Sequence, residues 1–217
     1  MTPWHTAHRT LDQVVSLFIM LIEYYQVGGI LTRGPGLNFI EATAVTPEGC
    51  VTPQDLGLWS DEQVEPLRTF VEFAHSQNQK VTLQLAHGGR KALTVAPWLH
   101  AGLSAPAVDG GWPESVVAPS AIPYNDQFPR PQAFTKEGIQ AIVLAFASAV
   151  RRALRAGLDV LEVHGAHGYL ISEILSPQTN KRTEKYGGSF GNRVRFALEV
   201  VNAIRAVIPE SMPLFLR

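Results

Sequence analysis

Three side chains that could take part in acid–base chemistry, those of His164, His167 and Tyr169, lie within six residues of the sequence. They directly follow the apolar segment 158–163, which has the length and composition of a buried strand. In a parallel α/β barrel, polar side chains at the carboxyl end of a strand point into the mouth where ligands bind. Since the backbone turns as it leaves the strand, a spacing of three residues can direct both imidazoles at one point.

Two imidazoles that point at one atom suit an oxygen that gains negative charge, such as a carbonyl oxygen that becomes an enolate. The phenol of Tyr169 would supply a proton nearby, because a tyrosine hydroxyl is a hydrogen-bond donor that keeps its proton at neutral pH. The alternative is structural, with two hydrogen-bonded histidines and a core tyrosine. Gly165 stands where a zinc site of the HExxH type needs a glutamate, so we predict no metal site.

A single amide, that of Gln84, interrupts the apolar segment 81–86, which we predict to be another strand. A buried amide needs hydrogen-bond partners. A backbone group and a flat heteroaromatic ring with donors and acceptors would both satisfy it, and the residue alone does not distinguish them.

Two segments with unusual composition, HGAHGYL and LSPQTNKRTEKYGGSFGNRVRF, run almost without a gap from His164 to Phe196. They resemble the signature of the Old Yellow Enzyme family, FMN-dependent ene-reductases built on a TIM barrel. The segment QLAHGGRKA, which begins at Gln84, resembles the third strand of the same family. One departure is Gly191, where the family usually carries a glutamate.

The resemblance implies that FMN lies across the mouth of the barrel. Gln84 and Arg217 would contact the polar edge of the flavin, and the backbone near Ala42 would also touch it. NADPH or NADH would reduce the flavin in a ping-pong cycle.

The resemblance also implies a small-molecule substrate, an α,β-unsaturated carbonyl compound of the enone type. His164 and His167 would bind its carbonyl oxygen as negative charge develops there. Tyr169 would be the catalytic residue that protonates the α-carbon, after hydride has reached the β-carbon.

The composition is that of an ordinary globular protein. The 217 residues are 46% hydrophobic and carry 18 Lys and Arg against 19 Asp and Glu, a balance that does not indicate nucleic-acid binding. No segment approaches the roughly 20 apolar residues of a membrane span. With Cys50 as the single cysteine, no intrachain disulfide can form, which fits a reducing compartment. We expect a cytoplasmic protein that binds no membrane.

The apolar periodicity predicts an alternation of strands and helices, which favours a parallel α/β sheet with crossover helices. The expected strands cover 37–45, 81–86, 158–163 and 213–217, and the expected helices cover 60–74, 135–157 and 189–207. Between 87 and 134 we expect a long irregular segment rich in proline and glycine. No G-x-G-x-x-G follows a strand, which argues against a Rossmann fold. Spacing leaves an open sheet and a barrel undecided, and the resemblance favours the barrel.

We interpret residues 1–217 as a single partial domain that covers about strands 2–5 of a (β/α)8 barrel. Within it, residues 9–26 fit the family pattern poorly while their flanks fit it, so we interpret them as an insertion. A TIM barrel typically takes about 250 residues. An unclosed sheet has unpaired edges, so we expect a second copy or a companion chain to complete the barrel.

Three functions follow from these observations. We favour an FMN-dependent NAD(P)H oxidoreductase of the Old Yellow Enzyme type, which reduces the activated C=C bond of an α,β-unsaturated carbonyl compound. One alternative is a flavin-free isomerase or epimerase that enolises a small metabolite with the same histidines and tyrosine. The other is a non-catalytic truncated homologue. Flavin binding and enone-dependent oxidation of NAD(P)H distinguish the first from the other two.

Overall fold

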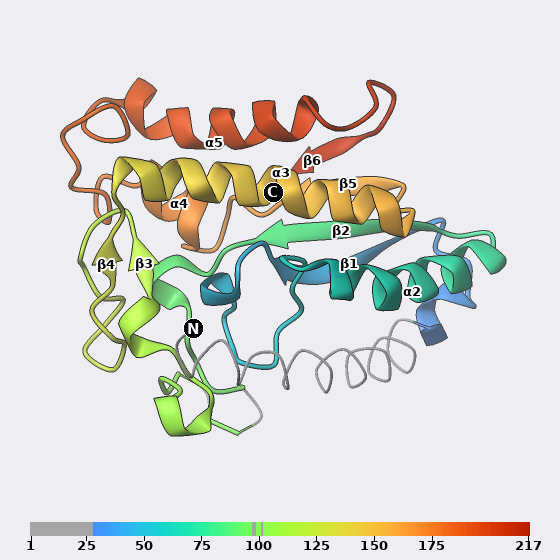
Figure 1. The fold of residues 1–217 in the computed structure, drawn as a ribbon, viewed down its shortest axis with the longest axis horizontal. Coiled ribbons are helices and arrows are strands. Elements are labelled where there is room, and N and C mark those ends of the chain that lie inside the picture. Colours follow the sequence, from blue (N-terminus) through green and yellow to red (C-terminus); the bar gives the residue numbers. More distant parts are fainter. Residues whose placement is uncertain (1–27, 97–98, 101) are drawn as a thin grey trace.

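A four-stranded parallel sheet organises the protein, in a computed structural model that describes residues 28–96, 99–100 and 102–217 (Figure 1). Its strands, in spatial order, are β1 (Leu37–Ala44), β2 (Lys80–Ala86), β5 (Val160–Val163) and β6 (Leu214–Leu216). A second, two-stranded sheet joins β3 (Val117–Ala118) to β4 (Gln132–Ala133). The order and direction confirm the predicted parallel α/β sheet.

The connections between the strands of the large sheet are helical. The helices are α2 (Val64–Ser76), α3 (Lys136–Ala156), α4 (Leu170–Leu175) and α5 (Phe190–Arg205). Short 3-10 turns occur at Pro47–Gly49, Asp61–Gln63, Gly89–Lys91, Ala107–Asp109 and Pro113–Ser115. Figure 1 shows α3 across the sheet with α5 alongside it. The helix α3 contacts both α5 and the strand β2.

Local sequence signals set the ends of α3. The hydroxyl of Thr135 accepts a hydrogen bond from the backbone N–H of Gly138, which satisfies one of the free amides of the first turn. Gly157 ends the helix with a φ of +93°, a left-handed conformation that glycine adopts without a steric penalty. Both caps were expected from the sequence, and both are confirmed.

The two faces of the large sheet differ in chemistry because side chains alternate along each strand. On one face, Leu83 and Leu161 lie side by side and belong to the apolar core that the strands form with α2, α3 and α5. On the other, which we call the cavity face, Gln84 pairs with Glu162 and the rings of Phe39 and Phe215 stack at 6.2 Å. The helices therefore cover the core face, and the polar side chains gather on the cavity face.

Several element boundaries differ from the sequence expectations. The strand expected at 37–45 ends at Ala44 and has a register shift between Ile40 and Ala42, and the short helix α4 was not expected at all. The proposed insertion at 9–26 lies outside the described residues. Among the described residues, no helix is long and apolar enough to cross a membrane.

Candidate active site

The cavity face carries a cavity of about 480 Å³ near the carboxyl ends of the strands. Its lining residues are Phe39, Ile40, Glu41, Ala42, Gln84, Glu162 and Arg217. The three residues predicted to contact the flavin are all in this lining. They come from β1, from β2 and from the position after β6, so the sheet brings together residues that are 175 positions apart in sequence (217 − 42).

A buried pair of polar side chains forms the floor of the cavity. The parallel register places Gln84 of β2 beside Glu162 of β5, and the Gln84 amide nitrogen donates a hydrogen bond to the Glu162 carboxylate. Each residue is 9% exposed. The amide partner is therefore a side chain and not a backbone group. Glu162 was not singled out from the sequence, although a carboxylate inside an apolar strand is itself a signal.

The donors and acceptors around the cavity fit the pyrimidine edge of a flavin. An amide, a carboxylate and the guanidinium of Arg217 line it, and apolar side chains from β1 lie beside them. A flat heteroaromatic ring with carbonyl and N–H groups can bond such a set while its faces contact apolar atoms. The residues present therefore fit FMN, the cofactor that the sequence resemblance implies.

His164, His167 and Tyr169 lie together beyond the end of β5. The His164 Nε2 atom is 3.3 Å from the His167 Nδ1 atom, and their ring centroids are 5.0 Å apart. The Tyr169 ring centroid lies 5.4 Å from that of His164. His164 is buried, whereas His167 is exposed. The structure thus brings together the three side chains that the spacing had suggested.

The turn that gathers these rings requires an unusual backbone. His167 and Gly168 have φ values of +58° and +72°, in the left-handed region that few residues other than glycine adopt. The Nζ atom of Lys91 donates to the His167 carbonyl at 2.7 Å, and the Tyr169 N–H donates to the Ala166 carbonyl at 3.2 Å. These bonds hold the turn in a conformation that would otherwise be costly.

Neighbouring strands fix the position of the same turn. The backbone N–H of His164 donates to the carbonyl of Leu85 near the end of β2, at 2.9 Å. The N–H of Gly165 donates to the carbonyl of Arg217 after β6, also at 2.9 Å. The N–H of Leu170 donates to the His87 carbonyl at 3.1 Å. The rings are therefore carried by backbone anchored on both sides of β5.

Burial sets the protonation of two of these side chains. It lowers the pKa of His164, and charge interactions with His167 and Arg217 lower it further, against an opposing effect of Glu162. Burial raises the pKa of Tyr169, and the Asp55 carboxylate adds to that rise. At neutral pH His164 is therefore neutral and Tyr169 keeps its proton, so the site offers hydrogen-bond donors and a proton source.

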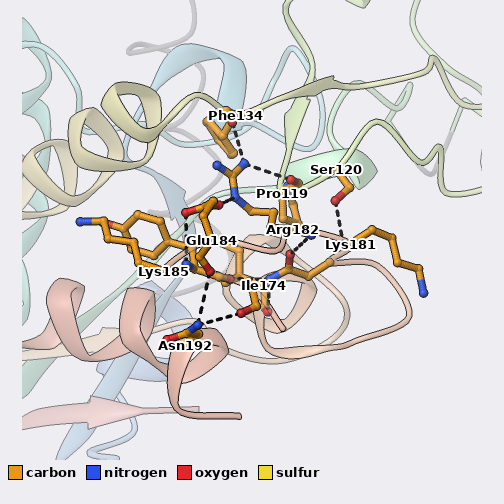
Figure 2. Close-up of polar contacts among 12 residues, drawn as sticks. Pro119, Ser120, Phe134, Ile174, Lys181, Arg182, Glu184, Lys185 and Asn192 are labelled. Carbon is orange, nitrogen blue, oxygen red and sulfur yellow. Dashed lines mark hydrogen bonds and ion pairs between the residues drawn. The ribbon is translucent and has the colours of Figure 1, made fainter. Parts of the chain in front are cut away.

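The motif after α4 ties the 117–134 segment to the site (Figure 2). The Arg182 guanidinium donates to the carbonyl of Phe134 at 2.6 Å and to that of Pro119 at 3.2 Å, and it pairs with Glu184. The N–H of Lys181 donates to the Ser120 hydroxyl at 2.9 Å. Much of the NKRTEKYGG motif thus has a positioning role, because it holds the segment that contacts Arg90 and Lys91, and Lys91 in turn bonds to His167.

Below the turn, α4 carries a buried acid. Glu173 is 1% exposed, and its Oε1 atom accepts from the Arg90 N–H at 3.0 Å. Burial raises its pKa to about 8, although Arg90 and Lys91 oppose the rise. Lys91 also lies over the rings of Tyr124 and Tyr169, at 4.6 and 5.7 Å from their centroids. Glu173 could not be identified from the sequence, since burial of a single helix position has no local signature.

The relatives of this chain are flavin oxidoreductases and NADPH dehydrogenases by name. Residues 1–217 match the NADH:flavin oxidoreductase / NADH oxidase family. The chain is 49% identical over 217 residues to an NADH:flavin oxidoreductase of Gibberella zeae, covering 100% of this chain and 48% of the relative. It is 46% identical over 182 residues to an NADPH dehydrogenase of Bacillus cytotoxicus, covering 84% of this chain and 47% of the relative. The chain thus spans about half the length of these relatives.

Solved structures give the same fold. Morphinone reductase superposes with a TM-score of 0.72 at 33% identity, over 86% of this chain and 50% of the other; one of its structures is a complex with tetrahydroNAD. Old Yellow Enzyme from Pichia sp. superposes with a TM-score of 0.74 at 29% identity, over 91% of this chain and 50% of the other. These likenesses confirm the TIM-barrel type predicted from the sequence. The chain belongs to the NADH:flavin oxidoreductase / NADH oxidase family, the Old Yellow Enzyme family whose signature its sequence carries.

Proposed function

We propose that this chain carries the flavin edge and the substrate site of an FMN-dependent NAD(P)H oxidoreductase, which reduces the activated C=C bond of an α,β-unsaturated carbonyl compound. One observation carries the proposal. The donor pair His164–His167 and the proton source Tyr169 follow β5, the strand whose Glu162 lines the cavity together with Gln84 and Arg217. The similarity to NADPH dehydrogenases and to a morphinone reductase solved with tetrahydroNAD supports a nicotinamide reductant.

The histidines would bind the carbonyl oxygen of the substrate. Each imidazole has at least one N–H to donate, and the 3.3 Å between their facing nitrogens allows an oxygen to replace that mutual contact. Two donors aimed at an oxygen stabilise it more as it gains charge, which lowers the barrier to hydride addition at the β-carbon. The pair therefore acts on the transition state more than on the ground state.

Tyr169 would complete the reaction as the general acid. Its phenol keeps its proton because burial and the nearby Asp55 raise its pKa. Transfer of that proton to the α-carbon gives the saturated carbonyl compound and leaves a phenolate, which solvent reprotonates. FMN, when bound, supplies the hydride and is reduced again by NAD(P)H. Ala42, Gln84 and Arg217 would hold it.

The test is the visible absorption spectrum of the purified 217-residue chain with added FMN, followed by NADPH oxidation with an enone such as 2-cyclohexenone. We expect a bound-flavin spectrum that bleaches with NADPH and recovers with the enone. Tyr169→Phe should keep the bleaching and slow the recovery by about 10²-fold or more, the usual contribution of general acid catalysis. Tyr124→Phe, which keeps a ring beside Lys91, is the matched control.

Other outcomes would replace this function. A folded, colourless protein that exchanges protons next to a carbonyl, and loses that activity in Tyr169→Phe, would be a flavin-free isomerase. A folded protein with neither property would be a non-catalytic homologue.

We also propose that a second copy or a companion chain completes the barrel, and that the protein is cytoplasmic. The stacked rings of Phe39 and Phe215 remain 44% and 40% exposed on the cavity face, and β1 and β6 are the edges of the described sheet. Apolar side chains and unpaired strand edges favour coverage by further polypeptide. Light scattering of the purified chain would show a dimer if the chain assembles with itself. Imaging of a tagged protein tests the location.

A further inference from the structure

The acid in the floor of the cavity has no role in the chemistry proposed above. Glu162 is 9% exposed, lies in the middle of the sheet between β2 and β6, and lines the cavity beside Gln84. A carboxylate is removed from water at a considerable cost unless hydrogen bonds compensate for it. Its described partner is the amide of Gln84, so the two side chains must be considered together.

The carboxylate determines which end of the Gln84 amide is free. An ionised carboxylate has acceptors only, so the atom that it binds must be the amide nitrogen, as the structure has it. The amide then has its carbonyl oxygen and one N–H left for a ligand. Without the carboxylate, the two ends of the amide could exchange by rotation, because they have nearly the same shape.

We propose that Glu162 is a positioning residue that makes Gln84 select a ring with an imide edge, where an N–H lies next to a carbonyl. The free carbonyl of Gln84 accepts from the ring N–H, and its remaining N–H donates to the ring carbonyl. Arg217, which lines the same cavity, has donors only and suits the acceptor atoms of such a ring. This inference rests on the proposed function, since flavin is the ring of this kind that the family implies.

The experiment compares two ligands, FMN and FMN methylated at the imide nitrogen N3, by titration of the chain and flavin fluorescence. We expect N3-methyl-FMN to bind the wild-type chain about tenfold or more weakly, because its methyl group replaces the donor. In Glu162→Gln both orientations of the Gln84 amide are populated, so the ratio of the two dissociation constants should fall about threefold. Gln84→Met keeps the side-chain length without the amide and measures the steric cost of the methyl group.

Glu41→Gln is the matched control, because this second carboxylate lines the same cavity and makes no described hydrogen bond to Gln84. Its ratio should stay within about twofold of the wild-type ratio, since the Gln84–Glu162 bond is retained. Equal binding of both ligands by the wild-type chain would overturn the inference alone, and so would an unchanged ratio in Glu162→Gln. A wild-type chain that binds neither ligand would overturn the proposed function together with the inference.

Discussion

Replacement of the buried acid Glu173 by glutamine tests whether the interior beneath the active-site turn holds a neutral carboxyl group. The side chain is 1% exposed, and burial raises its pKa from 4.5 to about 8. At neutral pH the folded protein therefore keeps a proton on Glu173 that the unfolded chain has released. Glutamine has nearly the shape of the protonated acid and can accept the same hydrogen bond from the Arg90 N–H.

The sign of the pH dependence follows from proton binding. Between pH 4.5 and about 8 the folded state binds more protons at this position than the unfolded state, so the free energy of unfolding falls as pH rises. Each pH unit in this window costs about 1.4 kcal/mol. From about pH 5 to about pH 7 the Glu173 carboxyl thus lowers the stability of the wild-type protein by roughly 3 kcal/mol relative to the Glu173→Gln variant.

The assay is urea denaturation of both proteins across this pH range, with the difference in unfolding free energy taken at each pH. We expect the difference to grow with pH in favour of Glu173→Gln. Glu65→Gln, at a carboxylate that is 72% exposed on α2, is the control and should give a difference that hardly varies. A difference for Glu173→Gln that is constant from about pH 5 to about pH 7 would refute a neutral buried acid.

Three further predictions concern stability. Gly191→Glu places a carboxylate in the first turn of α5, where a Cβ meets no atom within 4 Å. The variant should raise the free energy of unfolding, measured in urea, by about 1–2 kcal/mol. Gly191→Ala, which adds no charge, should give about half of that gain. Arg182→Ala removes the hydrogen bonds to the carbonyls of Pro119 and Phe134 and should lower the free energy of unfolding by about 2–3 kcal/mol. Amide hydrogen exchange should become faster in the segment that these bonds anchor. Arg182→Lys should lower the free energy of unfolding less. Burial lowers the pKa of His87 from 6.5 to about 4, so between these pH values the unfolded chain binds more protons at this position and the contribution of His87 to stability falls as pH drops, opposite in sign to that of Glu173. The difference in unfolding free energy between His87→Gln and the wild-type protein should therefore shift in favour of the variant as pH falls.

Much of the fold could be predicted because its signals are local. A strand or helix is recognised from the spacing of apolar residues within one segment, and the caps Thr135 and Gly157 act within one helical turn. The approach of three side chains in the candidate site was predictable for the same reason. His164, His167 and Tyr169 belong to one turn, so their approach needs no knowledge of distant contacts.

The remaining features depend on contacts between distant segments. The bond between Gln84 and Glu162 spans 78 residues and exists because two strands adopt one particular register. The partners of Arg182 lie 48 and 63 residues away, and its sequence motif contains no sign of them. Register and tertiary packing are set by the whole core, so residue types alone do not determine which polar side chains meet.

The proposed cofactor and substrate sides of the site are joined through one backbone hydrogen bond, so we expect their geometry to be coupled. The N–H of Gly165, between the two histidines, donates to the carbonyl of Arg217, which lines the cavity. A Cβ at position 165 would come within 3.0 Å of that same oxygen, so glycine permits the close approach of the two strand ends. A displacement of the strand end after β6 would therefore move the guanidinium and the imidazoles together. Under the proposed function, the distance between a bound flavin ring and the β-carbon that accepts its hydride would be set by the sheet, and not by the flexibility of either side chain.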